Sequence, residues 1–131
     1  MKIKTIVLVS LLSAGLGFFT AVQAHHSIAA EFDTSQEFDI KGTVTALEWH
    51  NPHIWVYLDV VNSAGEIEKW QCEIGSPNSL LRAGWRKEDL PVGIVLMGKA
   101  NPARDGSNTC ESRTLSTEDG KRIFSRQGPN G

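Results

Sequence analysis

The sequence lacks the short motifs that identify the common enzyme classes. It contains no phosphate-binding loop, no glycine fingerprint for dinucleotides and no G-x-S-x-G nucleophile elbow. Ser27, Ser76 and the four histidines would allow a Ser–His pair, but no carboxylate is evidently placed to orient a base. Internal repeats, low-complexity stretches and long runs of one charge are absent too, apart from a polar tail at residues 125–131. These absences favour binding over hydrolysis.

The sequence also lacks an excess of basic residues. It has 13 Lys and Arg against 15 Asp and Glu, and residues 1–24 contain two of the basic residues and none of the acidic ones. Residues 25–131 therefore carry a net charge of −4 with histidine neutral. Nucleic acids and anionic lipids both require a basic surface. We therefore expect neither as a partner.

Hydrophobic runs long enough to enter a membrane are confined to residues 1–24, which have the pattern of a secretory signal peptide. Two lysines precede an apolar stretch, and small residues stand at positions −3 and −1 of a cut after Ala24. Glycines interrupt the apolar stretch, which is short for a membrane span of roughly 20 residues. Cleavage before His25 would leave a single domain of 107 residues, in the periplasm or secreted, with no membrane span.

Cysteine is scarce: the chain has two, Cys72 and Cys110. In an oxidising compartment an even pair predicts a disulfide. A thiolate metal site is the alternative, but the C-x-x-C spacing that would favour it is missing.

What the sequence does contain is a series of short strands separated by turns. Alternating apolar and polar residues are clearest at 53–61, where Ile54, Val56 and Leu58 are expected to face the core. Ser76 followed by Pro77 predicts the start of a short helix. The expected elements are strands at 40–49, 53–61 and 67–74, a helix at 78–85, strands at 94–100 and 110–115, and a hairpin extension at 121–124.

This order predicts a mainly β domain over residues 25–131. Three meandering strands, a helix and two further strands are typical of the OB fold, a five-stranded Greek-key barrel with the helix between strands three and four. A disulfide from Cys72 to Cys110 would fit, because strands three and five are neighbours in that barrel. A small β-sandwich is the alternative, but it offers the helix no natural position.

The four histidines occur in two short stretches, His25 and His26 at the expected new N-terminus and His50 and His53 between the first two strands. In an OB fold the connection between those strands belongs to the usual ligand-binding side. Pro52 disfavours a helical Asn51, so the stretch must bend, and a β-turn here would favour a cis peptide.

These histidines suggest a copper site. An N-terminal histidine offers its α-amine and its imidazole as a chelating pair, and the amine titrates near pH 7.7–8.0, so a metal can displace its proton. His25 would supply two nitrogens and His53 or His50 the third, with His26 nearby. Nitrogen-rich sites favour Cu(II), followed by Zn(II) or Ni(II). Asp59 or Glu73 could orient a ligand.

Three other interpretations stay open. The histidine pair could be the unstructured start of an exported chain. The barrel could instead bind a small ligand, a glycan or a partner protein through an aromatic surface made by Trp49, Asn51, Trp55 and Tyr57, without a metal. A redox enzyme built on the copper site is the third, and it would need an open coordination position and a substrate surface.

Several short motifs together resemble a family of small exported bacterial proteins of unknown function, over nearly the whole of residues 25–131. The motifs are Ala-His-His-Ser at 24–27, Glu-Phe-Asp at 31–33, Lys-Gly-Thr-Val at 41–44, Glu-Trp at 48–49, Asn-Pro-His at 51–53, Gly-Ser-Pro-Asn at 75–78, Leu81, Gly-Trp at 84–85 and Asp-Gly-Ser-Asn at 105–108. The resemblance implies that His25, His26 and His53 belong to the family pattern and that His50 is variable. It also implies that the cysteine pair is a local staple outside the pattern.

Overall fold

The computed structural model describes residues 28–125. The chain divides into two compact units, Met1–Ala30 and Glu31–Gly131, and the β-sheet belongs to the second. The expected signal peptide, His25, His26 and nearly all of the expected polar tail lie outside the described residues.

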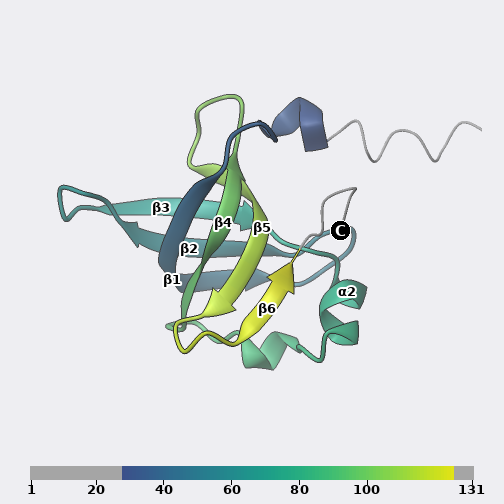
Figure 1. The fold of residues 1–131 in the computed structure, drawn as a ribbon. Helices are drawn as coiled ribbons and strands as arrows, with labels where there is room; N and C mark the ends of the chain where they lie inside the picture. Colours follow the sequence, from purple (N-terminus) through teal and green to yellow (C-terminus); the bar gives the residue numbers. More distant parts are fainter. Residues whose placement is uncertain (1–27, 126–131) are drawn as a thin grey trace, which may run out of the picture. The chain divides into compact units, whose positions relative to one another are not determined.

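The elements of the second unit follow the predicted order (Figure 1). They are β1 (Phe38–Glu48), β2 (Trp55–Val61), β3 (Ile67–Glu73), α2 (Pro77–Arg82), the 3₁₀ helix η1 (Lys87–Asp89), β4 (Val95–Pro102), β5 (Thr109–Thr117) and β6 (Arg122–Ser125).

The strands form one sheet that closes into a barrel. Antiparallel pairing runs in the order β3-β2-β1-β4-β5-β6, and a parallel pairing of β3 with β5 joins the ends of the five-stranded part. This closing ladder runs from Gln71 opposite Thr109 to Glu73 opposite Glu111. The predicted OB-like barrel, with a short helix between β3 and β4, is confirmed, and one sheet closed on itself excludes the two-sheet sandwich.

The alternation predicted for β2 decides which residues face the barrel interior. Ile54, Val56 and Leu58 are buried in the core, and Trp55 and Tyr57 are half-buried on the outer face. Each buried aliphatic side chain of this kind stabilises the fold by about 1.5–3 kcal/mol relative to exposure. The alternate residues of β2, Trp55 and Tyr57, therefore remain partly accessible to solvent and to ligands.

Helix α2 starts as the sequence predicts. Ser76 is the N-cap, its hydroxyl accepts a hydrogen bond from the Ser79 amide, and Pro77 occupies the first turn. Such caps satisfy an amide that the helix itself leaves without a partner.

The helix ends at Arg82, three residues earlier than expected, because Gly84 turns the chain with a φ of +88°. The Trp85 amide then donates to the Leu80 carbonyl and the Gly84 amide to the Leu81 carbonyl, which is a Schellman motif. Leu80 and Trp85 are buried, whereas Leu81 is 47% exposed.

The predicted disulfide is also confirmed. Cys72 on β3 and Cys110 on β5 are direct partners in the parallel ladder, with their Cα atoms 4.5 Å apart, and both are buried in the core. The bridge therefore links the two strands whose pairing closes the barrel.

Candidate functional site

The connection between β1 and β2 is a kinked corner. The Asn51–Pro52 peptide is cis, as the turn argument favoured. After the corner the chain is anchored to the end of β3, where the Ile54 amide donates to the Gly75 carbonyl and the Ile74 amide donates to the Ile54 carbonyl. His53 immediately precedes this anchor, so its backbone position is well defined.

A buried carboxylate holds the His53 ring. Nδ1 of His53 lies 3.0 Å from Oε1 of Glu73, and the two side chains are 35% and 7% exposed, respectively. Glu73 was one of two carboxylates expected to orient a ligand. The other, Asp59, forms an ion pair with Lys69 at 2.6 Å. One ring nitrogen of His53 therefore contacts a carboxylate that is almost inaccessible to water.

Glu73 belongs to a row of buried polar residues across three adjacent strands. In the ladders, Glu73 on β3 stands opposite Glu111 on β5, which stands opposite Asn101 on β4. All three residues are at most 5% exposed. Directly opposed residues share one face of a sheet, so these side chains lie on the opposite side from the core cysteines. Their spacing in the sequence gave no indication of this row.

His50 belongs to a different and more exposed cluster. Its Nε2 lies 3.3 Å from Oε2 of Glu48, its Nδ1 lies 3.2 Å from the Asn51 carbonyl oxygen, and the Tyr57 hydroxyl donates to Oε1 of Glu48 at 2.9 Å. The Tyr57 hydrogen bond, which is the largest single cause, lowers the pKa of Glu48, and the hydrogen bond and charge of His50 lower it as well. The hydrogen bond between Tyr57 and Glu48 also raises the pKa of Tyr57, because it stabilises the protonated phenol. The two loop histidines therefore bind different carboxylates.

The predicted aromatic surface is only partly continuous. Trp49 packs against the hydrophobic core, whereas Trp55 and Tyr57 are half-buried on the outer face of β2. A pocket of about 250 Å³ adjoins Tyr57 and is also lined by Trp70, Lys69, Gln71, Asn108 and Thr109. Residues 69–71 and 108–109 were not expected to line a site. Asn108 belongs to the Asp-Gly-Ser-Asn motif, but the motif indicated no binding role, and the pairing of β3 with β5 is what brings these residues together.

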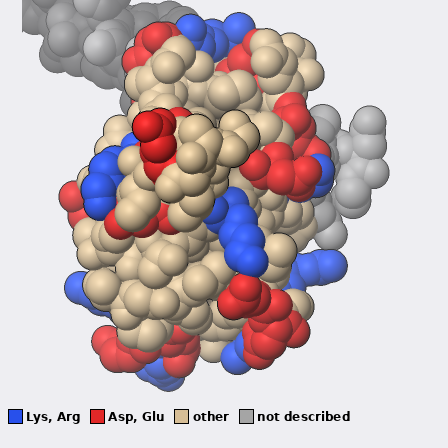
Figure 2. All heavy atoms as spheres, turned by 90° about the vertical axis from the view of Figure 1, so that its left-hand side faces the viewer, with Lys and Arg blue, Asp and Glu red and all other residues tan. Residues whose placement is uncertain are grey.

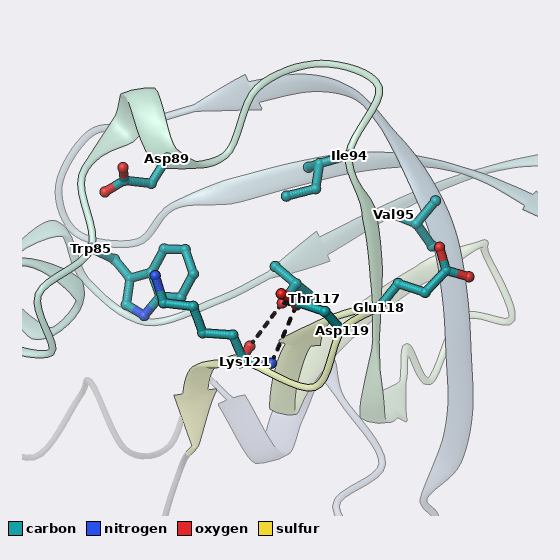
Figure 3. A pocket seen from close by; sticks show the side chains of 8 residues that line it. All are labelled: Trp85, Asp89, Ile94, Val95, Thr117, Glu118, Asp119 and Lys121. Atoms are coloured by element: carbon teal, nitrogen blue, oxygen red, sulfur yellow. Dashed lines mark hydrogen bonds between the residues drawn. The ribbon is translucent and has the colours of Figure 1, made fainter.

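A second and larger pocket, of about 410 Å³, lies where the β5–β6 turn meets the chain between α2 and β4 (Figure 3). The Lys121 ammonium lies 4.3 Å from the centroid of the Trp85 ring. The Thr117 hydroxyl donates to Asp119 and the Trp85 indole donates to the Arg122 carbonyl. These polar groups stabilise the turn and the packing of Trp85.

Charge is dispersed over the surface seen in Figure 2. Acidic and basic side chains are interspersed on the face toward which the β2–β3 hairpin points, and neither sign forms a broad patch there. Among residues 28–125, ion pairs join Lys41 to Glu118, Lys69 to Asp59, Lys99 to Asp39 and Arg104 to Asp33.

Within residues 28–125, no three His, Cys, Asp or Glu side chains are grouped so that they could hold a metal ion. The same part of the chain has no helix that is long and apolar enough to cross a membrane.

Comparison with known proteins identifies a family. The model of the "family of unknown function (DUF6152)" matches residues 14–112. No curated protein matches the chain. Among solved structures, the mitochondrial single-stranded DNA-binding protein Rim1 from S. cerevisiae is similar with 9% sequence identity and a TM-score of 0.49, over 63% of this chain and 93% of that chain. A likeness at this level carries no argument about fold or function.

Proposed function

The chain belongs to this family of unknown function, and we propose that it is an exported protein that binds Cu(II) through His25 and His53. Signal cleavage after Ala24 makes His25 the first residue, so that its α-amine and imidazole supply two nitrogens. His53 supplies the third, and His26 lies next to the site. The protein handles or delivers copper in the periplasm or outside the cell.

The observation that carries this proposal is the contact between His53 and Glu73. A histidine that binds a metal commonly donates its other ring N–H to a carboxylate, which fixes the tautomer and the ring orientation. With the proton of His53 on Nδ1, 3.0 Å from Glu73, the lone pair for the metal is on Nε2. Glu73 is almost entirely buried, and the low local dielectric strengthens the electrostatic attraction between this carboxylate and the His53 ring.

The donor set suits Cu(II). Two imidazoles and a primary amine are the borderline nitrogen ligands that divalent copper prefers at the top of the Irving–Williams order, with Zn(II) and Ni(II) behind. The cysteines do not contribute, because both sulfur atoms are in the disulfide. His50 is the weaker ligand candidate, since its ring nitrogens face Glu48 and a backbone carbonyl.

The test compares Cu(II) affinity of the protein that begins at His25 with that of the same protein carrying one extra N-terminal glycine. Intact mass of the exported protein first establishes where the chain begins. We expect the extra residue to weaken binding strongly, because it moves the α-amine away from the imidazole. Equal affinities, or an exported chain that begins elsewhere, would refute the proposal.

Two further variants test the role of the barrel. Glu73→Gln is expected to lower Cu(II) affinity by about 10–100-fold, the usual effect of losing a carboxylate partner of a ligand histidine. His53→Ala should lower the affinity further and change the copper electron paramagnetic resonance spectrum. His50→Ala is the matched control and should leave both unchanged.

A further inference from the structure

The pocket beside Tyr57 is built by residues from three adjacent strands. Tyr57 on β2 stands opposite Gln71 on β3, and Gln71 stands opposite Thr109 on β5. The three side chains therefore share the outer face of the barrel. Asn108, from the loop between β4 and β5, and Trp70 complete the wall with Lys69. The position is the outer side of β2 and β3 next to the β4–β5 loop, and neither His53 nor Glu73 lines the pocket.

The polar groups of this pocket are held in place before any ligand arrives. The Gln71 side-chain amide donates to the Thr109 hydroxyl at 3.1 Å, and the Gln71 backbone amide donates to the Asn108 carbonyl at 3.0 Å. The Tyr57 ring is fixed by its hydrogen bond to Glu48. Side chains that are already ordered lose less conformational entropy when a ligand binds.

The lining is nearly neutral. Its one charged residue, Lys69, forms a 2.6 Å ion pair with Asp59, which offsets the positive charge. The other residues that line it are uncharged, and among them the Trp70 ring packs against the core and Phe38. A nucleic acid or other polyanion needs several basic contacts to bind, and this pocket does not provide them.

An aromatic ring next to amides and a hydroxyl matches the chemistry of an uncharged sugar. A pyranose ring has an apolar C–H face that packs on an aromatic ring, and hydroxyl groups at its edge that bond to amides and hydroxyls. Ligand pockets generally combine such an apolar surface with a few placed polar groups. The β2–β3 face and the β4–β5 loop of OB folds are used for oligosaccharides as well as for oligonucleotides.

We propose that this pocket binds a neutral oligosaccharide, with the Tyr57 ring as the apolar surface and Gln71, Asn108 and Thr109 as the hydrogen-bonding edge. Binding at this pocket is independent of copper, because none of these residues is a proposed metal ligand.

The experiment titrates the metal-free exported protein, labelled with ¹⁵N, with maltotetraose, cellotetraose, chitotetraose and xylotetraose up to millimolar concentration. A short oligothymidylate is titrated in parallel. We expect at least one tetrasaccharide to shift the amide resonances of residues 57, 71, 108 and 109. No shift with any of the four saccharides, or tighter binding of the oligothymidylate than of any saccharide, would overturn the proposal.

Variants then locate the site. Tyr57→Ala and Gln71→Ala should each weaken saccharide binding by about tenfold, which corresponds to the loss of one good contact. Tyr57→Phe keeps the ring and should retain most of the affinity. Gln36→Ala, an exposed glutamine outside the pocket, is the matched control. Unchanged affinity in Tyr57→Ala and Gln71→Ala would refute the assignment.

Two further measurements keep the result interpretable. Asn108→Ala changes a loop residue and tests the same wall if Tyr57→Ala does not fold. His53→Ala should lower the Cu(II) affinity and leave saccharide binding intact, so failure of one proposal can be distinguished from failure of the other.

Discussion

Reduction of the disulfide is expected to destabilise the barrel mainly by raising the conformational entropy of the unfolded chain. The bridge joins Cys72 to Cys110 across 38 residues, and this loop contains α2, η1 and all of β4. In the loop-entropy description, a closed loop of this length stabilises the folded protein by about 4 kcal/mol. Domains of this size have a total free energy of unfolding of about 5–15 kcal/mol. Loss of the disulfide is therefore expected to remove a large share of the stability of the protein.

The measurement is urea unfolding followed by tryptophan fluorescence, with oxidised protein compared with protein unfolded, reduced and refolded under reductant. These two forms contain the same side chains, so the comparison isolates the cross-link. We expect the free energy of unfolding to fall by about 4 kcal/mol and the melting temperature by on the order of 15–30 °C. The urea dependence should become steeper, because the reduced unfolded chain exposes more surface.

The double variant Cys72→Ala and Cys110→Ala provides the second arm. Both residues are buried, so removing the sulfur atoms adds a packing loss to the loss of the cross-link. The variant should therefore be less stable than the reduced protein. A difference below about 1 kcal/mol between the oxidised and reduced proteins would refute the reasoning, since the loop argument predicts several times that amount.

Two smaller predictions concern the outer face and the sheet. Tyr57→Phe should raise the pKa of Glu48 toward its ordinary value, because the Tyr57 hydrogen bond is the largest single cause of the lowered pKa; carboxyl ¹³C chemical shifts followed through acidic pH measure this pKa, and an unchanged value would contradict the assignment. Since the folded pKa is lowered, ionised Glu48 stabilises the fold above its ordinary pKa, and this contribution is lost as the pH falls through the lowered value. Gly98→Ala should destabilise the protein by about 1–3 kcal/mol or more, because the new Cβ would overlap the Thr114 carbonyl of the adjacent strand; an unchanged melting temperature would refute this.

Most of the fold could be predicted because its causes are local. Alternation of Ile54, Val56 and Leu58 with polar and aromatic residues requires a strand with one buried face. The Ser76 cap and Pro77 start a helix whatever packs against it later. The helix end was misjudged because the stretch up to Trp85 looks continuous, whereas Gly84 adopts a left-handed conformation that terminates it.

The candidate site could be predicted only in part. The composition, the histidine doublet and the Asn51–Pro52–His53 corner are properties of short stretches of chain, so they indicated which residues could carry chemistry. Glu73 and Asp59 were both plausible carboxylate partners for a ligand histidine, and the local sequence pattern did not indicate which of them contacts it. That choice depends on how the corner folds back onto the end of β3.

The sequence by itself determined the order of the strands, the helix start, the pairing of the two cysteines and the set of candidate ligands. Each of these follows from residues close together in the chain or, for the disulfide, from there being only two cysteines to pair. The tertiary structure alone decided that Glu73 holds His53, that Glu111 and Asn101 continue the same buried row, and that Tyr57, Gln71 and Thr109 form one wall. These contacts arise where β3 meets β5, and strand register between distant segments is set by closure of the whole barrel rather than by any local pattern.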